Sequence, residues 1–253
     1  MAFRQPDVRK MMKTLILLLL LSSTSLYVSA QAAAKINNPG ATAPADAAVE
    51  TAKAALAAHG GDKLKALKTL IIRGSADVTM SAFNQAFPAS FAMVIAGERY
   101  RLEVQSQFQT LKQVYDGKEM SSSIPGFSLP PVTSLGFPLL PHIGDAGYLI
   151  SPLAEAGNKK GFRMTTPDGF YTDFLVDEKT RRIKGYESSY DYNGRTITTS
   201  VVIDKYRVVD GITVPEKYSQ RFDLGQMTAY ADFKAKEILI NSPVADDVFS
   251  IGK

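Results

Sequence analysis

The sequence predicts an α+β fold in which one large, curved, antiparallel β-sheet of about ten strands follows a helix near the N-terminus. From Thr69 to Ile240, apolar and polar residues alternate in segments separated by turn signals every 8 to 14 residues. No helical pattern interrupts these segments, which excludes parallel βαβ units and dinucleotide-binding folds. Because a sheet of this size usually curls or closes, we expect it to wrap around the helix.

The first 45 residues are predicted to lie outside the folded domain. Four basic residues, the apolar run from Leu15 to Leu21 and the small-x-small sequence ending at Ala30 are typical of a cleavable secretory signal peptide, residues 1–30; a retained membrane anchor is the alternative. Residues 31–45 are rich in Ala, Asn, Pro and Gly and predict a flexible linker. The domain is therefore expected to comprise residues 46–253, and export predicts a periplasmic location.

Charge and cysteine content exclude several kinds of partner and chemistry. Cleavage after Ala30 removes four basic residues and one acidic residue from totals of 29 and 25, which leaves 25 against 24. Such a near-neutral chain offers no basic stripe for nucleic acid and no polybasic patch for anionic lipid. With no cysteine, the chain has neither disulfides, nor thiolate chemistry, nor a lipidated cysteine.

Each element has a local signature. Asp46 is a plausible N-cap for a helix that ends at His59-Gly60-Gly61, and a short turn from Asp62 to Leu67 leads into the sheet. The strands are predicted at 69–79, 91–96, 99–104, 110–115, 161–166, 170–176, 182–190, 196–206, 212–222 and 227–240.

The second and third strands should form a hairpin around Gly97-Glu98. Strand alternation places three larger apolar residues of each strand on one face, and we expect that face to be the concave one. The six residues are Phe91, Met93, Ile95, Tyr100, Leu102 and Val104.

One stretch, from Ile124 to Pro152, differs from the rest of the chain. It holds six prolines and four glycines but only one formal charge, Asp145, and it is one of the most apolar parts of the domain. Prolines and glycines at this density exclude a long helix or a central strand. Long irregular apolar segments are often lids or binding loops, so the stretch predicts a hydrophobic lid over a cavity. The alternative is a plug that fills the end of an ordinary β core.

The search for catalytic chemistry gives little. The chain has two histidines, no HExxH, no GxSxG elbow, no P-loop and no GxGxxG, so no metal, cofactor or catalytic residue is predicted. We interpret His59 as a polar residue near a helix C-terminus, where an imidazolium would suit the helix dipole. Tyr186, Ser188, Tyr190 and Tyr192 share one strand face, which indicates a half-buried sheet surface rather than a stacking platform.

Several short sequences together resemble the LolA-like superfamily of periplasmic outer-membrane lipoprotein-sorting and lipid-carrier proteins. They are Ala57–Gly61, Leu64–Leu67, Leu70–Gly74, Val114–Gly117, Tyr206–Pro215 and Ile240–Phe249. The resemblance covers roughly residues 46–251. It implies an unclosed β-barrel whose apolar cavity, lidded by helices and loops, holds acyl chains. The chain departs from the family in its Pro-rich rather than helical lid, and no arginine here is matched to the one that holds the family's lid shut.

These inferences predict a non-enzymatic, monomeric periplasmic carrier or binder of a lipid or acylated lipoprotein, with transient contacts to envelope membrane proteins left open. The alternatives are an envelope structural or signalling module whose cavity is filled by its own lid and, with less support, a hydrolase. The residues expected to line the cavity and lid are Phe91, Met93, Ile95, Tyr100, Leu102, Val104, Phe127, Leu129, Leu135, Phe137, Leu139, Leu140, Phe170 and Phe174.

Overall fold

The computed structural model describes residues 42–81, 85–107, 109–123, 131–154, 159–192, 195–223 and 228–250. The predicted signal peptide lies outside these residues, as does the linker up to residue 41. Gly40 to Lys253 form one compact unit. In the described residues, no helix has the length and apolar character needed to cross a membrane.

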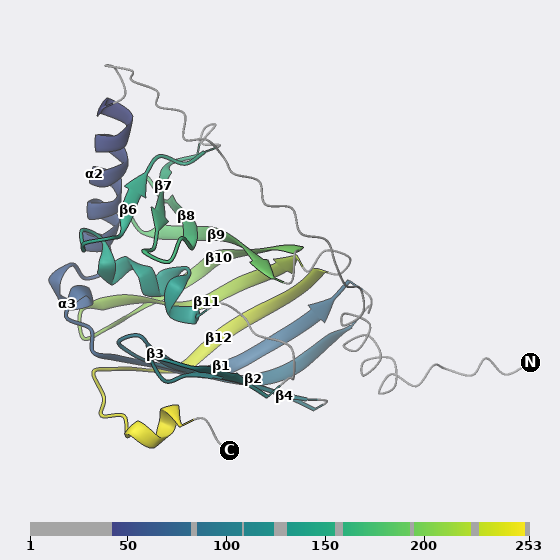
Figure 1. Cartoon of the computed structure of the whole chain (residues 1–253). Coiled ribbons are helices and arrows are strands. Elements are labelled where there is room, and N and C mark those ends of the chain that lie inside the picture. The colour runs from purple at the N-terminus through teal and green to yellow at the C-terminus, as the bar shows by residue number, and fades with distance from the viewer. Residues whose placement is uncertain are drawn as a thin grey trace, which may run out of the picture. The chain divides into compact units, whose positions relative to one another are not determined.

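All strands of the described chain belong to one antiparallel sheet (Figure 1). The spatial order is β5-β4-β3-β2-β1-β12-β11-β10-β9-β8-β7-β6, so β5 and β6 are separate edges and the sheet is unclosed. The strand bounds are β1 Thr69–Met80, β2 Ala86–Ala96, β3 Arg99–Ser106, β4 Thr110–Tyr115, β5 Met120–Ser122, β6 Leu149–Ser151, β7 Gly161–Thr165, β8 Tyr171–Val176, β9 Ile183–Tyr192, β10 Arg195–Val209, β11 Ile212–Asp223 and β12 Thr228–Ile240.

The described residues thus form twelve strands rather than about ten. The two that the sequence did not predict, β5 and β6, are three residues long, too short for alternation to be visible. The turn between β10 and β11 follows its sequence signal closely. Asp210 and Gly211 both have positive φ, 51° and 83°, which a two-residue hairpin turn that follows the sheet twist requires.

In the described residues, five helical elements accompany the sheet: α2 Thr42–Ala58, α3 Asp62–Lys65, and the 3₁₀ turns η2 Val132–Ser134, η3 Phe137–His142 and η4 Asp246–Phe249. Because α2 begins at Thr42, the predicted N-cap role of Asp46 is wrong and this residue lies inside the helix. The helix ends as expected, at Gly60 and Gly61 with φ of 123° and 54°.

One face of the sheet, together with α2 and η3, forms the main hydrophobic core. The core runs from Tyr100 in β3 to Phe162 in β7, and it includes Ala52 and Ala55 of α2, both fully buried. Figure 1 shows why distant strands meet: the sheet bends across its width, so that β6–β8 stand steeply against β1, β2 and β12. The small alanine side chains let α2 lie close to this concave face.

The opposite face has a smaller core under the C-terminal turn η4. Phe249 is buried there with Val94 and other apolar residues. Arg99 holds the turn in place with an ion pair to Asp246 at 2.8 Å, and its guanidinium lies 4.6 Å from the centre of the Phe249 ring. Strands β1, β2 and β4 are therefore covered on both faces near this end, which explains why Val94 is apolar although it points away from the concave side.

Candidate functional site

The hairpin register places the six predicted β2 and β3 residues together. Phe91 pairs with Val104, Met93 with Leu102, and Ile95 with Tyr100. All six belong to or pack against the concave core. They differ in exposure: Phe91, Ile95 and Tyr100 are buried, whereas the other three are half-buried.

The remaining predicted site residues divide into three groups. Phe137, Leu139, Leu140 and Phe174 are buried in the same core. Leu135 and Phe170 are half-buried and lie outside it. Phe127 and Leu129 lie outside the described residues. The structure therefore brings ten of the fourteen predicted side chains into one apolar cluster.

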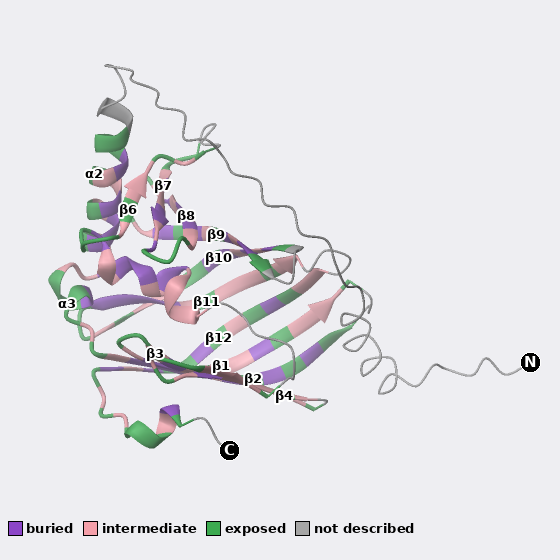
Figure 2. Cartoon of the chain, in the orientation of Figure 1, coloured by how far each residue is buried: buried purple, intermediate pink, exposed green. Residues whose placement is uncertain are grey.

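Residues Phe137–Ile143, which contain η3, fill one end of the concave face. Leu139 and Leu140 are 0% exposed, and Figure 2 shows much of the short helical turns in front of β11 as buried. The segment enters the core at Gly136, whose N–H donates to Thr172 Oγ1 at 3.0 Å. Gly136 has φ of 67°, and a Cβ atom there would lie 2.5 Å from the ring of Tyr186. Only glycine fits this close approach without displacing the tyrosine.

His59 lies beneath the same segment and is completely buried. Its Nδ1 lies 2.8 Å from the carbonyl oxygen of Thr213, an acceptor, so Nδ1 carries the proton. Its Nε2 accepts a hydrogen bond of 3.0 Å from the N–H of Ile183. Burial lowers the pKa of His59, and the positive charge of Arg182 adds to this, although the bond to Thr213 opposes it. The imidazolium expected from the sequence is therefore wrong, and a neutral ring joins the end of α2 to β9 and β11.

The other end of the concave face carries half-buried apolar side chains. Phe233 of β12 packs edge-on against Phe91, with ring centres 5.1 Å apart, and stacks on Tyr218 of β11 at 4.8 Å. Met93, Leu102 and Val104 continue this surface across β2 and β3, and Val78 adds to it from β1. Burial raises the pKa of Tyr218, which keeps its phenol neutral. We call Met93, Leu102, Val104, Tyr218 and Phe233, with Val78, the open apolar surface.

Tyr218 and Phe233 were not among the predicted site residues, although the sequence contains a signal for them. In β12, Ala231, Phe233 and Ala235 alternate with Asp232, Lys234 and Lys236, which places the apolar set on the covered face. The residue opposite Phe233 in β11 is Tyr218. Strand pairing across the sheet, which a single sequence does not show, is what joins them to Phe91.

The described residues contain no group of three or more His, Asp or Glu side chains placed to hold a metal ion. The tyrosine-rich face of β9 contributes to the core instead of forming an exposed platform: Ser188 and Tyr190 are buried, and the Tyr186 ring lies 5.9 Å from that of Phe174. The site is therefore an uncharged concave surface of apolar side chains, one end of which is filled by the chain itself.

The fold is shared with solved structures. A LolA superfamily protein from Nitrosomonas europaea superposes with a TM-score of 0.51 at 10% identity, covering 81% of this chain and 97% of that one. The comparison also finds a DUF1329 family protein from Desulfovibrio piger (TM-score 0.48, 12% identity, covering 82% of this chain and 97% of that one). It further finds a putative outer membrane lipoprotein-sorting protein domain from Vibrio parahaemolyticus (TM-score 0.45, 11% identity, covering 81% and 97%). No family model and no curated protein matches the sequence.

The unclosed antiparallel sheet and its short N-terminal helix thus define a LolA-like fold. At 10% identity the likeness concerns the fold alone.

Proposed function

We propose that this protein is a non-enzymatic carrier or binder of acyl chains, from a lipid or an acylated lipoprotein, and that the open apolar surface is where the chain lies. The observation that carries the proposal is that Met93, Leu102, Val104, Tyr218 and Phe233 are continuous with the core yet only half-buried. Such a surface has apolar area left to bury, and the side chains that form it carry no charge.

The energetics of transfer support an acyl chain as the ligand. Each methylene that leaves water for an apolar surface gains about 0.8 kcal/mol, so a few buried methylenes give useful affinity without any catalytic group. Concave, mostly apolar sites that are largely preformed are the usual form of small-molecule pockets. The fold of the Nitrosomonas protein is compatible with this use.

Export to the periplasm belongs to the same proposal. A cleaved signal peptide over residues 1–30 would place the domain where lipids and lipoproteins cross between membranes. The partners are then a lipid or acylated lipoprotein, with transient contacts to envelope membrane proteins, and the protein acts as a monomer.

The proposal is tested by comparing one aromatic residue on each face of β12. Phe233→Asp places a charge on the open apolar surface, whereas Tyr230→Asp makes the same kind of change at a side chain that is 47% exposed. We expect protein purified mildly from the periplasmic fraction to retain acyl-containing material in native mass spectrometry, and to bind a fluorescent fatty acid. Phe233→Asp should lower this binding at least tenfold, because a carboxylate is costly to desolvate beside an acyl chain.

Tyr230→Asp should bind as the wild type does. Equal binding by both variants, or a wild-type protein that neither retains nor binds acyl chains, would contradict carriage at this surface. Thermal unfolding of each variant separates loss of the surface from loss of the fold.

A second candidate function is a structural or signalling module of the envelope. The complete burial of Leu139 and Leu140 favours it, because a segment packed this tightly resembles a core more than a lid. This module would bind no acyl chain in the experiment above, while remaining folded and exported.

A further inference from the structure

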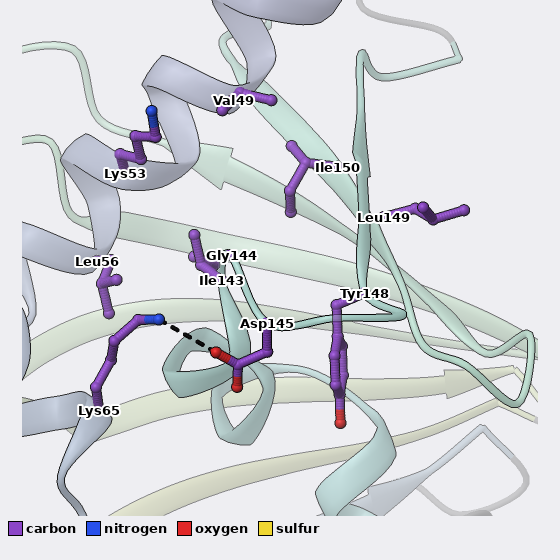
Figure 3. Close-up of a pocket in the computed structure, with 10 residues that line it drawn as sticks. All are labelled: Val49, Lys53, Leu56, Lys65, Ile143, Gly144, Asp145, Tyr148, Leu149 and Ile150. Carbon is purple, nitrogen blue, oxygen red and sulfur yellow. Dashed lines mark hydrogen bonds and ion pairs between the residues drawn. The ribbon is translucent and has the colours of Figure 1, made fainter.

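A hollow of about 390 Å³ lies away from the open apolar surface, between α2, the chain that follows η3, and β6 (Figure 3). Val49 and Leu56 line it from α2, Ile143 from the end of the 3₁₀ turn, and Ile150 from β6. Figure 3 shows Ile150 directed toward the helix, whereas Leu149 points away from it. We call this hollow the outer pocket. Its volume is at the lower end of the range for small-molecule sites, about 300 to 1,000 Å³.

The walls of the outer pocket are apolar and firmly held. Leu56 and Ile143 are 9% and 4% exposed and also belong to the concave core, so their positions are fixed by packing on the other side. Ile150 packs against the same core. Leu149, whose side chain points away from α2 (Figure 3), is 66% exposed. The buried faces of Leu56, Ile143 and Ile150 suit an apolar chain.

Three charged side chains line the outer pocket, and they are not equivalent. Asp145 forms an ion pair with Lys65 at 3.2 Å and a hydrogen bond with His142 at 3.1 Å. Although partial burial opposes the shift, these contacts lower the pKa of Asp145, so the carboxylate is charged and its charge is balanced by Lys65. Lys53, the third, is paired at 2.9 Å with Glu50, which is not part of the lining.

The Lys53–Glu50 pair leaves Lys53 available to a ligand. Both side chains are mostly exposed, 61% and 72%, and an exposed pair of this kind contributes little stability. The ammonium can therefore turn toward a ligand at small cost. Among the residues that line the pocket, two lysines stand against one carboxylate, and Glu50 lies outside the lining, so the lining carries one excess positive charge.

We propose that the outer pocket binds the apolar end of an anionic amphiphile, such as a fatty carboxylate, with Lys53 as the partner of its head group. This site is separate from the open apolar surface, and the inference does not depend on carriage there. It uses a part of the Pro- and Gly-rich stretch, from Ile143 to Ile150, that lies outside the buried Phe137–Leu140 turns.

The probe is decanoate. Decyltrimethylammonium, which has an alkyl chain of similar length and a positive head group, is the comparison. Isothermal titration calorimetry measures the affinity of the protein for each. Wild-type protein should bind decanoate more tightly. Val49→Trp, which fills the outer pocket from α2, should weaken decanoate binding at least tenfold. Lys53→Glu should weaken it by about two- to fivefold, the range expected for one exposed charge pair, and should reverse the preference between the two probes.

Lys236→Glu is the matched control, because it makes the same charge change at an exposed position of β12 outside the pocket, and it should leave both affinities unchanged. Because decanoate can also bind at the open apolar surface, Phe233→Asp should remove that contribution only. The site that remains in Phe233→Asp should still prefer decanoate and should be lost when Val49→Trp is added. If Phe233→Asp abolishes decanoate binding and Val49→Trp does not, the proposal for the outer pocket is wrong, while acyl binding at the open apolar surface stands. Failure of wild-type protein to bind decanoate, or an unchanged preference in Lys53→Glu, overturns it as well. Circular dichroism confirms that each variant is folded.

Discussion

The two ends of the concave face have similar side chains but differ in how they are filled. At one end, Leu139 and Leu140 are 0% exposed beneath neighbouring elements. At the other, Met93 and Leu102 are half-buried although they belong to the same cluster. The difference arises because the apolar segment enters the core at Gly136 and leaves it after Ile143, toward β6. Apolar composition alone therefore does not distinguish a core from a binding surface; what covers each residue does.

The largest expected effect is on stability at the filled end. Leu140→Ala should lower the free energy of unfolding by about 2 to 5 kcal/mol, because it removes buried methyl groups and leaves a cavity. Met93→Ala, at the open end, should cost about 1 kcal/mol or less, since part of that side chain already contacts water. Urea unfolding of both variants measures the difference.

Similar costs for Leu140→Ala and Met93→Ala would remove the distinction between the two ends. A loss near 1 kcal/mol at Leu140 would further mean that η3 opens readily and acts as a lid, as the sequence predicted for the whole stretch.

A smaller effect tests how the segment is anchored. Gly136 and Gly97 both have positive φ, 67° and 61°, but a Cβ atom at Gly97 meets nothing within 4 Å, whereas at Gly136 it meets the Tyr186 ring. Gly97→Ala should lower the free energy of unfolding by about 1 to 2 kcal/mol, because only the backbone conformation opposes the new side chain. Gly136→Ala should cost about 1 to 3 kcal/mol more, because its ψ of −145° is nearly restricted to glycine and the ring must also move. If thermal unfolding shows the same loss of stability for both variants, the segment can shift at Gly136 to make room for a Cβ atom, and it is weakly anchored there.

Much of the sheet could be predicted from the sequence because alternation and turn residues are local signals. The ten predicted strands are all present, and the register of Phe91 on Val104 follows from the Gly97-Glu98 turn. Asp46 was misplaced because a capping residue is also tolerated inside a helix, and helix ends are the least certain part of any such prediction.

The division of the concave face could not be predicted, because it depends on contacts between residues distant in sequence. His59 is buried by β9 and β11, more than 120 residues away, so its neutral state has no local signature. For the same reason, Phe233 and Tyr218 become part of a site only when β12 lies beside both β1 and β11. The sequence of the Pro- and Gly-rich stretch shows that it is apolar, but it does not show which part of the stretch the rest of the fold buries.

The smallest expected effect is a pH dependence that reports whether the filled end stays dry. Because burial holds the pKa of His59 below its usual value of 6.5, the unfolded chain takes up a proton first as the pH falls. The stabilisation is thus complete above about pH 6.5 and is lost below it, at up to about 1.4 kcal/mol per pH unit, until the folded state is protonated as well. When the pH is lowered from 7.5 to 5.5, the free energy of unfolding in urea should fall by about 1 kcal/mol more in wild-type protein than in His59→Asn. Leu139→Ala, a core variant that keeps His59, should show the same pH dependence of stability as the wild type. A His59→Asn variant with the same slope as wild type would mean that water reaches the ring and that this end, too, is open.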